Sequence, residues 1–237
     1  MAGTLYLLPV SLGDTPWDRY LPLHVRETAC KLSRFIVENA KTARAELKRV
    51  GHPQPLRAVV IEEIPTKCDP ASIDRLLMSL LQGIDMGLMS EAGCPAVADP
   101  GALIVRRAHE LDIPVMPLVG PSSLLLGLMA SGLDGQRFAF HGYLPAREPE
   151  RSQRIIALEQ ESSRWGQTQL FIETPYRNKA MLDTLLKCCQ PSTRLCIATD
   201  LTLPTQEIVS CRIEQWHART LPQLDKRPTL FLLLSER

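Results

Sequence analysis

Short apolar runs alternate with helix-like segments along the first half of this chain of 237 residues. The runs have the length and composition of strands, and the segments between them carry apolar residues at helical spacing. The strand-like runs cover residues 4–8, 35–37, 57–64, 86–89 and 113–118, and the helix-like segments cover residues 42–50, 72–81, 101–111 and 123–131. This order predicts a largely parallel sheet with helices on both faces.

The pattern changes after residues 132–135, which read Gly-Leu-Asp-Gly. Several strand-like runs then follow one another without a long helix between them, which predicts a mixed sheet containing hairpins. Strands are expected at 138–140, 168–172, 195–199, 207–212 and 229–234, and helices at 151–164 and 178–188. The sequence therefore predicts an α/β protein of two domains, residues 1–119 and 120–237, with a hinge near Gly120.

A loop rich in small residues, 90–97 (SEAGCPAV), follows the strand expected at 86–89. Gly and Ala leave room for a ligand to lie against the backbone. Asp99 is a favourable N-cap and Pro100 suits the first helical turn, so a helix is expected to begin there. A second loop of the same kind, 120–123 (GPSS), follows the next strand.

Two such loops at successive strand ends indicate one ligand crevice at the carboxyl edge of the sheet. The spacing fits two ordinary strand-to-helix turns equally well, and the residues alone leave both interpretations open. The first loop of the chain, 8–14 (LPVSLGD), contains no G-x-G-x-x-G, so it is not a dinucleotide-binding fingerprint.

Four motifs that occur in order carry a resemblance to a known family. They are LMSEAGCPAVADPG at 88–101, PLVGPSS at 117–123, FAFHGYLP at 138–145 and FIETPYR at 171–177. From Leu5 to the C-terminus the chain resembles the tetrapyrrole methylase superfamily of S-adenosylmethionine (SAM) dependent methyltransferases. Within it, the chain is most similar to the branch containing the bacterial 16S ribosomal RNA ribose 2′-O-methyltransferase.

The resemblance implies a tetrapyrrole-methylase-like fold, with a mostly parallel N-terminal sheet, a mixed C-terminal sheet and SAM in the cleft between the domains. SAM needs an apolar slot for adenine, polar groups for the ribose and backbone donors for its carboxylate. Val97 suits the apolar wall, and Ser122 and Ser123 stand at a helix N-terminus, where N–H groups favour an anion. The residues expected to bind SAM are Pro9, Val10, Ser90, Glu91, Ala92, Gly93, Cys94, Val97, Ser122, Ser123, Glu173, Pro175, Ala198 and Thr229.

The catalytic residues stay unassigned, with Glu38 and Glu173 as candidates. A hydroxyl acceptor needs a group that takes its proton, and a carboxylate can do so. Glu173 lies four residues before Arg177, so a structural ion pair is the alternative to a role in the cleft. His141, between Phe140 and Gly142, is interpreted as a hydrogen-bonded structural residue rather than a base.

Two motifs depart from the ribosomal branch. That branch has Ala-Glu-Asp-Thr-Arg after the second strand, where this chain has Val-Glu-Asn-Ala-Lys at 37–41. It also has Arg-Glu-Leu-Thr-Lys in the second domain, where this chain ends its equivalent segment with Leu203. Replacement of Asp by Asn39 removes a possible base, and replacement of Lys by Leu203 removes a possible phosphate contact. The changes predict a conserved SAM half and an altered substrate half of the site.

The resemblance therefore predicts a SAM-dependent methyltransferase with an unassigned acceptor. Three alternatives stay open: an RNA ribose 2′-O-methyltransferase, a methylase of tetrapyrroles or other small molecules, and a SAM-binding module without catalysis. Salt-sensitive binding to RNA is expected only for the first of these.

The formal net charge is +1, which argues against a protein that is basic over its whole surface. The cations nevertheless form two local groups, and solvated faces of amphipathic helices are the favoured interpretation of both. The first group is Arg34, Lys41, Arg44, Lys48 and Arg49, and the second is Arg147, Arg151 and Arg154.

The surroundings of the protein are predicted from what the sequence contains. No apolar stretch approaches the roughly 20 residues that span a bilayer, so no membrane association is expected. The 7 cysteines lack metal-ligand spacing, which favours reduced thiols in a cytoplasm and no metal site. Members of the superfamily are commonly homodimers, and the apolar segment 124–129 leads us to expect a two-fold dimer.

Overall fold

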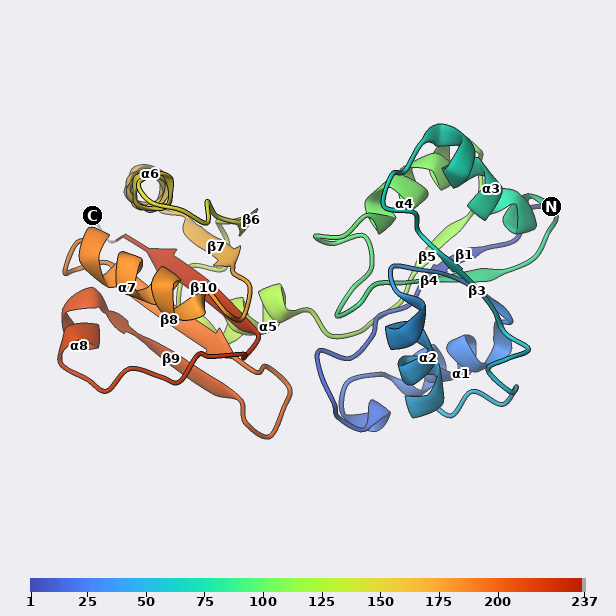
Figure 1. Cartoon of the computed structure of the whole chain (residues 1–237), viewed down its shortest axis with the longest axis horizontal. Coiled ribbons are helices and arrows are strands. Elements are labelled where there is room, and N and C mark those ends of the chain that lie inside the picture. The colour runs from blue at the N-terminus through green and yellow to red at the C-terminus, as the bar shows by residue number, and fades with distance from the viewer. Residues whose placement is uncertain (236–237) are drawn as a thin grey trace. The chain divides into compact units, whose positions relative to one another are not determined.

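The computed structural model describes residues 1–235, which form two compact units (Figure 1). The first unit is Met1–Ser122 and the second begins at Ser123. Each unit contains one five-stranded sheet. None of the helices in residues 1–235 has the length and apolar character needed to cross a membrane.

The first unit contains a fully parallel sheet with the strand order β3-β2-β4-β1-β5, as the alternating pattern predicted. Every crossover between neighbouring strands therefore passes over a face of the sheet. The elements are β1 (Leu5–Leu7), the 3-10 helix η1 (Trp17–Arg19), α1 (Leu23–Lys31), β2 (Arg34–Val37), α2 (Ala40–Arg49), β3 (Val60–Glu63), α3 (Pro70–Leu81), β4 (Met86–Met89), α4 (Gly101–Glu110) and β5 (Val115–Pro117).

Helices cover both faces of this sheet (Figure 1). Helices α1 and α2 pack on one face, where Phe35 and Val37 of β2 point into the core. Helices α3 and α4 pack on the other, where Ile36 of β2 meets Leu77. Because residues 35–37 of β2 are buried on both faces of the sheet, they are continuously apolar rather than alternating.

The second unit contains a mixed sheet with the order β6-β7-β10-β8-β9. Strand β6 is parallel to β7, and the other neighbouring pairs are antiparallel, so the predicted mixed sheet is confirmed. The elements are α5 (Ser123–Ser131), β6 (Phe138–Tyr143), α6 (Glu150–Trp165), β7 (Thr168–Ile172), α7 (Asn178–Cys188), β8 (Arg194–Thr199), β9 (Glu207–Arg212), α8 (Ile213–His217) and β10 (Thr229–Leu234).

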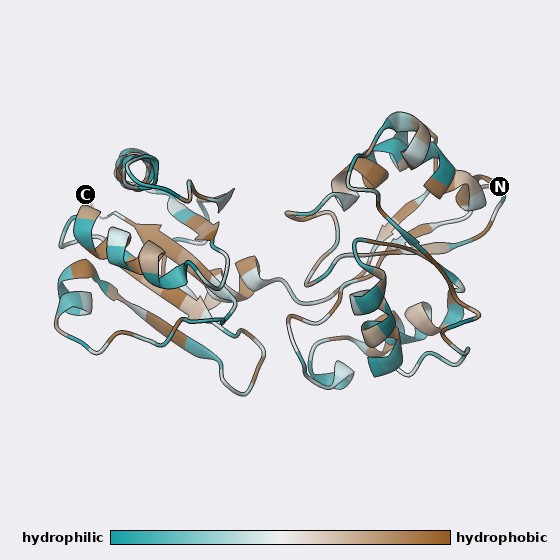
Figure 2. Ribbon diagram, in the orientation of Figure 1, coloured by the Kyte–Doolittle hydropathy of each residue, from teal (hydrophilic) through white to brown (hydrophobic). Residues whose placement is uncertain are grey.

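The most apolar segments of the second unit are its central strands, whereas α6 is largely hydrophilic (Figure 2). The core of this unit is built around the stacked rings of Phe171 and Phe231, whose centroids lie 5.7 Å apart, and the fully buried Trp216. Strand β10 is the central strand of the sheet, between β7 and β8, and its side chains are buried from Thr229 to Leu233.

The sequence missed three short elements and placed the start of β3 three residues too early. Helix α1 buries only Val25 and Ala29, too few apolar residues to give a helical period, and η1 and α8 are short. Strand β3 begins at Val60 rather than at residue 57, because a turn closed by the Ala58 N–H and the Pro55 carbonyl precedes it (2.8 Å).

Candidate functional site

The loops that follow β1 and β4 are joined by two backbone hydrogen bonds. The Val10 N–H donates to the Gly93 carbonyl at 2.9 Å, and the Gly93 N–H donates to the Val10 carbonyl at 3.2 Å. Gly93 has φ of +73°, which an L side chain adopts only at a cost. Val10 and Gly93, two predicted cofactor residues that lie 83 positions apart in the sequence, thus join two loops at the carboxyl end of the parallel sheet.

The third predicted loop, 120–123, contacts this pair of loops. A Cβ on Gly120 would lie 2.2 Å from Cβ of Pro9, so only glycine lets the two segments pack together. The Cys94 thiol donates to the Pro121 carbonyl at 3.3 Å. Burial raises the pKa of Cys94, so this thiol stays neutral and serves as a donor rather than as a nucleophile.

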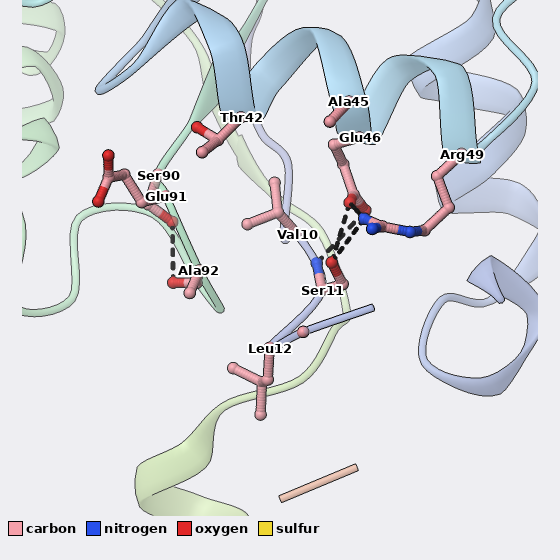
Figure 3. Close-up of a pocket in the computed structure, with 11 residues that line it drawn as sticks. Val10, Ser11, Leu12, Thr42, Ala45, Glu46, Arg49, Ser90, Glu91 and Ala92 are labelled. Carbon is pink, nitrogen blue, oxygen red and sulfur yellow. Dashed lines mark hydrogen bonds and ion pairs between the residues drawn. The ribbon is translucent and has the colours of Figure 1, made fainter. Parts of the chain in front are cut away.

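Within the loop at 90–97, side chains and backbone fix a tight turn. The buried Ser90 hydroxyl donates to the Ala92 carbonyl at 3.1 Å (Figure 3). Beyond the turn, the apolar side chain of Val97 is 49% exposed. The loop therefore presents backbone and small side chains, the surface predicted for a ligand that lies against the chain.

Asp99 and Pro100 differ from their predicted capping roles. Pro100 occupies the N-cap position of α4, and the helix begins at Gly101. Asp99 stands one residue before this N-cap. Its Oδ1 accepts hydrogen bonds from the Gly101 N–H at 2.6 Å and from the Ala96 N–H at 3.1 Å. Its carboxylate thereby ties the loop to the helix start instead of capping the second or third helical N–H.

Ala96 and Ala98 adopt positive φ values, +67° and +62°. The left-handed region costs roughly 1–2 kcal/mol for an L residue other than Gly, Asn or Asp. The bonds to Asp99 oppose this cost, and the second carboxylate oxygen, Oδ2, is buried without a hydrogen-bond partner among residues 1–235. Burial raises the pKa of Asp99, with nearby Glu38 adding to the effect.

Glu38 and Asn39, which follow β2, both support backbone. Oε2 of Glu38 accepts a hydrogen bond from the Glu91 N–H at 2.9 Å, so this carboxylate holds the loop at 90–97. Oδ1 of Asn39 accepts from the N–H groups of Lys41 and Thr42, at 2.9 and 3.2 Å, and caps α2. The position at which the ribosomal branch has Asp is thus a helix cap in this chain.

A pocket of about 190 Å³ opens beside the bridged loops (Figure 3). Helix α2 forms one wall, the loop after β1 a second and the turn after β4 a third. Its lining residues are Val10, Ser11, Leu12, Gly13, Thr42, Ala45, Glu46, Arg49, Ser90, Glu91 and Ala92. Four predicted cofactor residues therefore share one pocket with side chains of α2.

The floor of this pocket holds a polar cluster that the sequence did not indicate. Glu46 is 4% exposed and accepts hydrogen bonds from the Ser11 hydroxyl at 3.0 Å, from the Tyr20 hydroxyl at 2.5 Å and from Arg49. Burial and the hydrogen bond to Glu46 raise the pKa of Tyr20. The one available signal is that Glu46 lies on the same face of α2 as the buried Ala43 and Leu47.

The predicted residues of the second unit lie at one end of three adjacent strands, β7, β10 and β8. In register, Ile172 pairs with Leu230, Leu230 with Ala198, and Thr229 with Thr199. The Asn178 amide donates to the Thr229 hydroxyl at 3.1 Å, fixing the start of β10.

Glu173 comes directly after β7 and is 4% exposed. Its Oε1 accepts from the Arg177 guanidinium at 2.6 Å and from the Thr174 N–H at 2.6 Å. This is the ion pair that the sequence left open as an alternative. Pro175 lines a separate pocket of about 440 Å³ together with Tyr176 and Lys179.

His141 is held on both ring nitrogens, by Gln169 at 2.5 Å and Arg154 at 3.2 Å, in agreement with its predicted structural role.

Comparison with known proteins finds relatives that share one name. No family model matches it. Ribosomal RNA small subunit methyltransferase I of Escherichia coli O157:H7 is 34% identical over 200 residues, 84% of this chain and 66% of that protein. The proteins of the same name from Micromonospora olivasterospora (30% over 221 residues, 92% and 66%) and Xylella fastidiosa (31% over 175 residues, 74% and 60%) are also similar. The chain spans less than two thirds of the length of these relatives.

Solved structures share the fold. The methyltransferase CobJ has a TM-score of 0.64 at 14% identity, covering 99% of this chain and 95% of that one. Uroporphyrin-III-C-methyltransferase from Thermus thermophilus has a TM-score of 0.54 at 19% identity, covering 99% and 93%.

The chain is thus similar in sequence to ribosomal RNA small subunit methyltransferases I, and it shares the fold of two methyltransferases of tetrapyrrole type. The predicted fold class is confirmed. These relatives and both solved structures are named methyltransferases, the enzyme class that the sequence predicted.

The geometry groups the predicted cofactor residues into two sets, one in each unit. Pro9, Val10, Gly93 and Cys94 contact one another or the loop at 120–121. Glu173, Ala198 and Thr229 lie at neighbouring strand ends in the second unit. Their binding of SAM stays a prediction, as do catalytic roles for Glu38 and Glu173.

Proposed function

We propose that this chain is a SAM-dependent methyltransferase that transfers a methyl group to a ribose hydroxyl of RNA. The observation that carries the proposal is the bridge between Val10 and Gly93. It joins the loop at 8–14 to the motif loop at 90–97, beside the pocket that α2 lines. The name of the relatives, ribosomal RNA small subunit methyltransferase, supports RNA as the acceptor class. The methylated nucleotide is left unassigned.

The loop at 90–97 suits the methyl donor. When bound, SAM supplies an electrophilic methyl group, and the protein supplies position and the exclusion of water. The small side chains of Ala92 and Gly93 leave backbone accessible, and Val97 offers an apolar surface for a nucleobase. The bonds of Ser90, Cys94 and Asp99 fix the loop before a ligand arrives, which lowers the cost of ordering it on binding.

Of the two carboxylates considered for proton transfer, Glu38 is better placed than Glu173. Glu173 is buried and engaged by Arg177. Glu38 is only half-buried, and its hydrogen bond to Glu91 uses Oε2, which leaves Oε1 to accept a proton. We therefore assign to Glu38 the role of taking the proton of the acceptor hydroxyl.

The test is transfer of label from radioactive SAM to RNA. The purified chain is incubated with small ribosomal subunits and with their extracted RNA, and the product is digested and examined for ribose-methylated nucleosides by mass spectrometry. Label in a 2′-O-methyl nucleoside is expected. Label in a base, transfer to a tetrapyrrole, or SAM binding without turnover on RNA would each overturn the proposal, and the last two would favour the small-molecule and non-catalytic alternatives.

We also propose that the protein acts as a homodimer in the cytoplasm. Leu125 and Met129, one turn apart on α5, are 53% and 79% exposed, while the opposite side of this helix packs on β8, β9 and β10. The seven cysteines form no disulfide among residues 1–235, which suits a reducing compartment. Light scattering at micromolar concentration is expected to give twice the mass of the chain, and a monomer mass would exclude the dimer.

A further inference from the structure

We infer that the exposed face of α2 formed by Lys41, Arg44 and Lys48, the α2 basic face, binds the phosphate backbone of an RNA. The inference rests on the proposed function, since it names the surface that brings an RNA acceptor to the site.

The α2 basic face is a single stripe along the helix. Lys41, Arg44 and Lys48 follow one another at spacings of three and four residues, which places them on one side of an α-helix over roughly 10 Å. All three are exposed. Such a stripe presents positive charge along a line, as a strand of phosphates presents negative charge.

No carboxylate neutralises these three cations within residues 1–235, where none of the ion pairs includes them. The one acidic residue of α2, Glu46, is buried and accepts from Ser11 and Arg49. Solvated helix faces usually alternate charges at i and i+4, and this face does not. For these three residues, the lack of paired carboxylates favours a binding role over the solvated helix face that the sequence indicated.

The second basic group behaves differently. Arg151 pairs with Glu148 at 2.7 Å, and Arg154 pairs with Glu161 at 2.8 Å. These cations are already compensated, so a polyanion would have to displace carboxylates to reach them. The contrast selects α2 from the two groups that the sequence brought forward.

The α2 basic face borders the pocket at the bridged loops. Thr42, Ala45 and Arg49, each one position after a member of the basic face, line the pocket wall (Figure 3). The turn Ser90 to Ala92 forms the facing wall. A strand whose phosphates lie on the basic face would therefore pass along the rim of this pocket, where one ribose can turn inward.

An RNA fits this face better than a lipid surface does. A helix that binds membranes needs a broad apolar face beside its cations. The exposed residues of α2 other than the three cations amount to Ala45, because Ala43 and Leu47 are buried in the core. Recognition by charge alone therefore points to a polyanion in water.

The experiment compares two triple variants of equal charge. Lys41→Gln, Arg44→Gln and Lys48→Gln remove the α2 basic face. Lys67→Gln, Arg75→Gln and Arg106→Gln remove three exposed cations at α3, α4 and the segment before α3, on the side of the sheet opposite α2. The probe is an in vitro transcript of small-subunit ribosomal RNA, with affinity measured by filter binding from 50 to 200 mM salt, and S-adenosylhomocysteine binding is measured by calorimetry.

The α2 variant is expected to bind the transcript about tenfold or more weakly at 0.1 M salt, and to lower the slope of log K against log salt by about 2. Its affinity for S-adenosylhomocysteine is expected to match the wild type, and the control variant is expected to bind RNA as the wild type does. Equal losses in both variants, or none in the α2 variant, would overturn the inference.

These measurements distinguish failure of the α2 basic face as an RNA-binding surface from failure of the proposed function. If the wild type binds RNA through α2 but transfers no methyl group to it, the surface stands and the proposed function fails. If the wild type methylates RNA and the α2 variant binds RNA unchanged, the function stands and the surface fails.

Discussion

Glu46 of α2 accepts a hydrogen bond from the Ser11 hydroxyl at 3.0 Å, across 35 positions of sequence. The carboxylate also accepts from Tyr20 and Arg49, so one buried group fixes the loop after β1 against the helix. A buried charge with this many partners is costly to remove, because the partners are left unsatisfied.

Glu46→Ala is therefore expected to lower the free energy of unfolding by about 2–3 kcal/mol. Glu46→Gln is expected to cost less, because its amide oxygen still accepts from Ser11. Urea denaturation of the two variants measures the difference. Ser11→Ala is the control for the single bond, and if it costs as much as Glu46→Ala, the cluster does not depend on the carboxylate.

Replacement of Ala92 by Leu is expected to abolish binding of S-adenosylhomocysteine, since a bulky side chain would occupy the space above the backbone of the loop. Ala92 is exposed, so the fold has no reason to change. Calorimetry gives the affinity, and Ala102→Leu, at an exposed position of α4, is the matched control. Normal affinity in Ala92→Leu would place the cofactor elsewhere.

Asp99 makes the stability of the loop depend on pH. Burial raises its pKa in the folded state, so the folded protein holds the proton more tightly than the unfolded chain does. The sign follows from linkage: the contribution to stability is greatest at low pH and is lost as the pH rises through the folded-state pKa. Asp99→Asn keeps an oxygen that accepts from Ala96 and Gly101 and removes the titration.

We therefore expect Asp99→Asn to be at least as stable as the wild type at pH 7 and to flatten the change of stability with pH just above the ordinary aspartate pKa. Asp99→Ala, which loses both bonds, is expected to be less stable at every pH. Thermal unfolding from pH 4 to pH 8 provides the comparison, and parallel pH curves for the wild type and Asp99→Asn would refute the assignment.

The sequence predicted the elements that carry continuous apolar runs, because burial of strands such as β4 and β10 on both faces leaves a direct trace in composition. It also brought the loops at 90–97 and 120–123 to one sheet edge. It did not predict α1, whose buried side chains are only Val25 and Ala29. The sequence could not predict the cluster at Glu46, because its partners Ser11 and Tyr20 come from segments whose packing no local pattern encodes.

Asn39 and Leu203 are two of the departures from the motifs of the ribosomal branch. The structure gives Asn39 a capping role that Asp would also perform, but an amide cannot take a proton from a hydroxyl as a carboxylate can. Leu203 follows Asp200 in the turn between β8 and β9, and Asp200 is engaged by Arg227 at 2.7 Å. An apolar side chain at 203 offers nothing to a phosphate.

We accordingly expect that this chain does not restore ribose methylation at the native position in a strain that lacks the ribosomal 2′-O-methyltransferase. Asn39 leaves Glu38 as the one carboxylate of this pair, and loss of a charged contact to a substrate costs on the order of 1–3 kcal/mol. The double variant Asn39→Asp, Leu203→Lys is expected to gain methylation there, because Asp keeps the cap and adds a negative charge at a helix N-terminus, where it is favourable. Mapping of ribose methylation in the small-subunit RNA measures the activity of the unaltered chain and of the double variant. Methylation at the native position by the unaltered chain would show that Asn39 and Leu203 are compatible with that substrate.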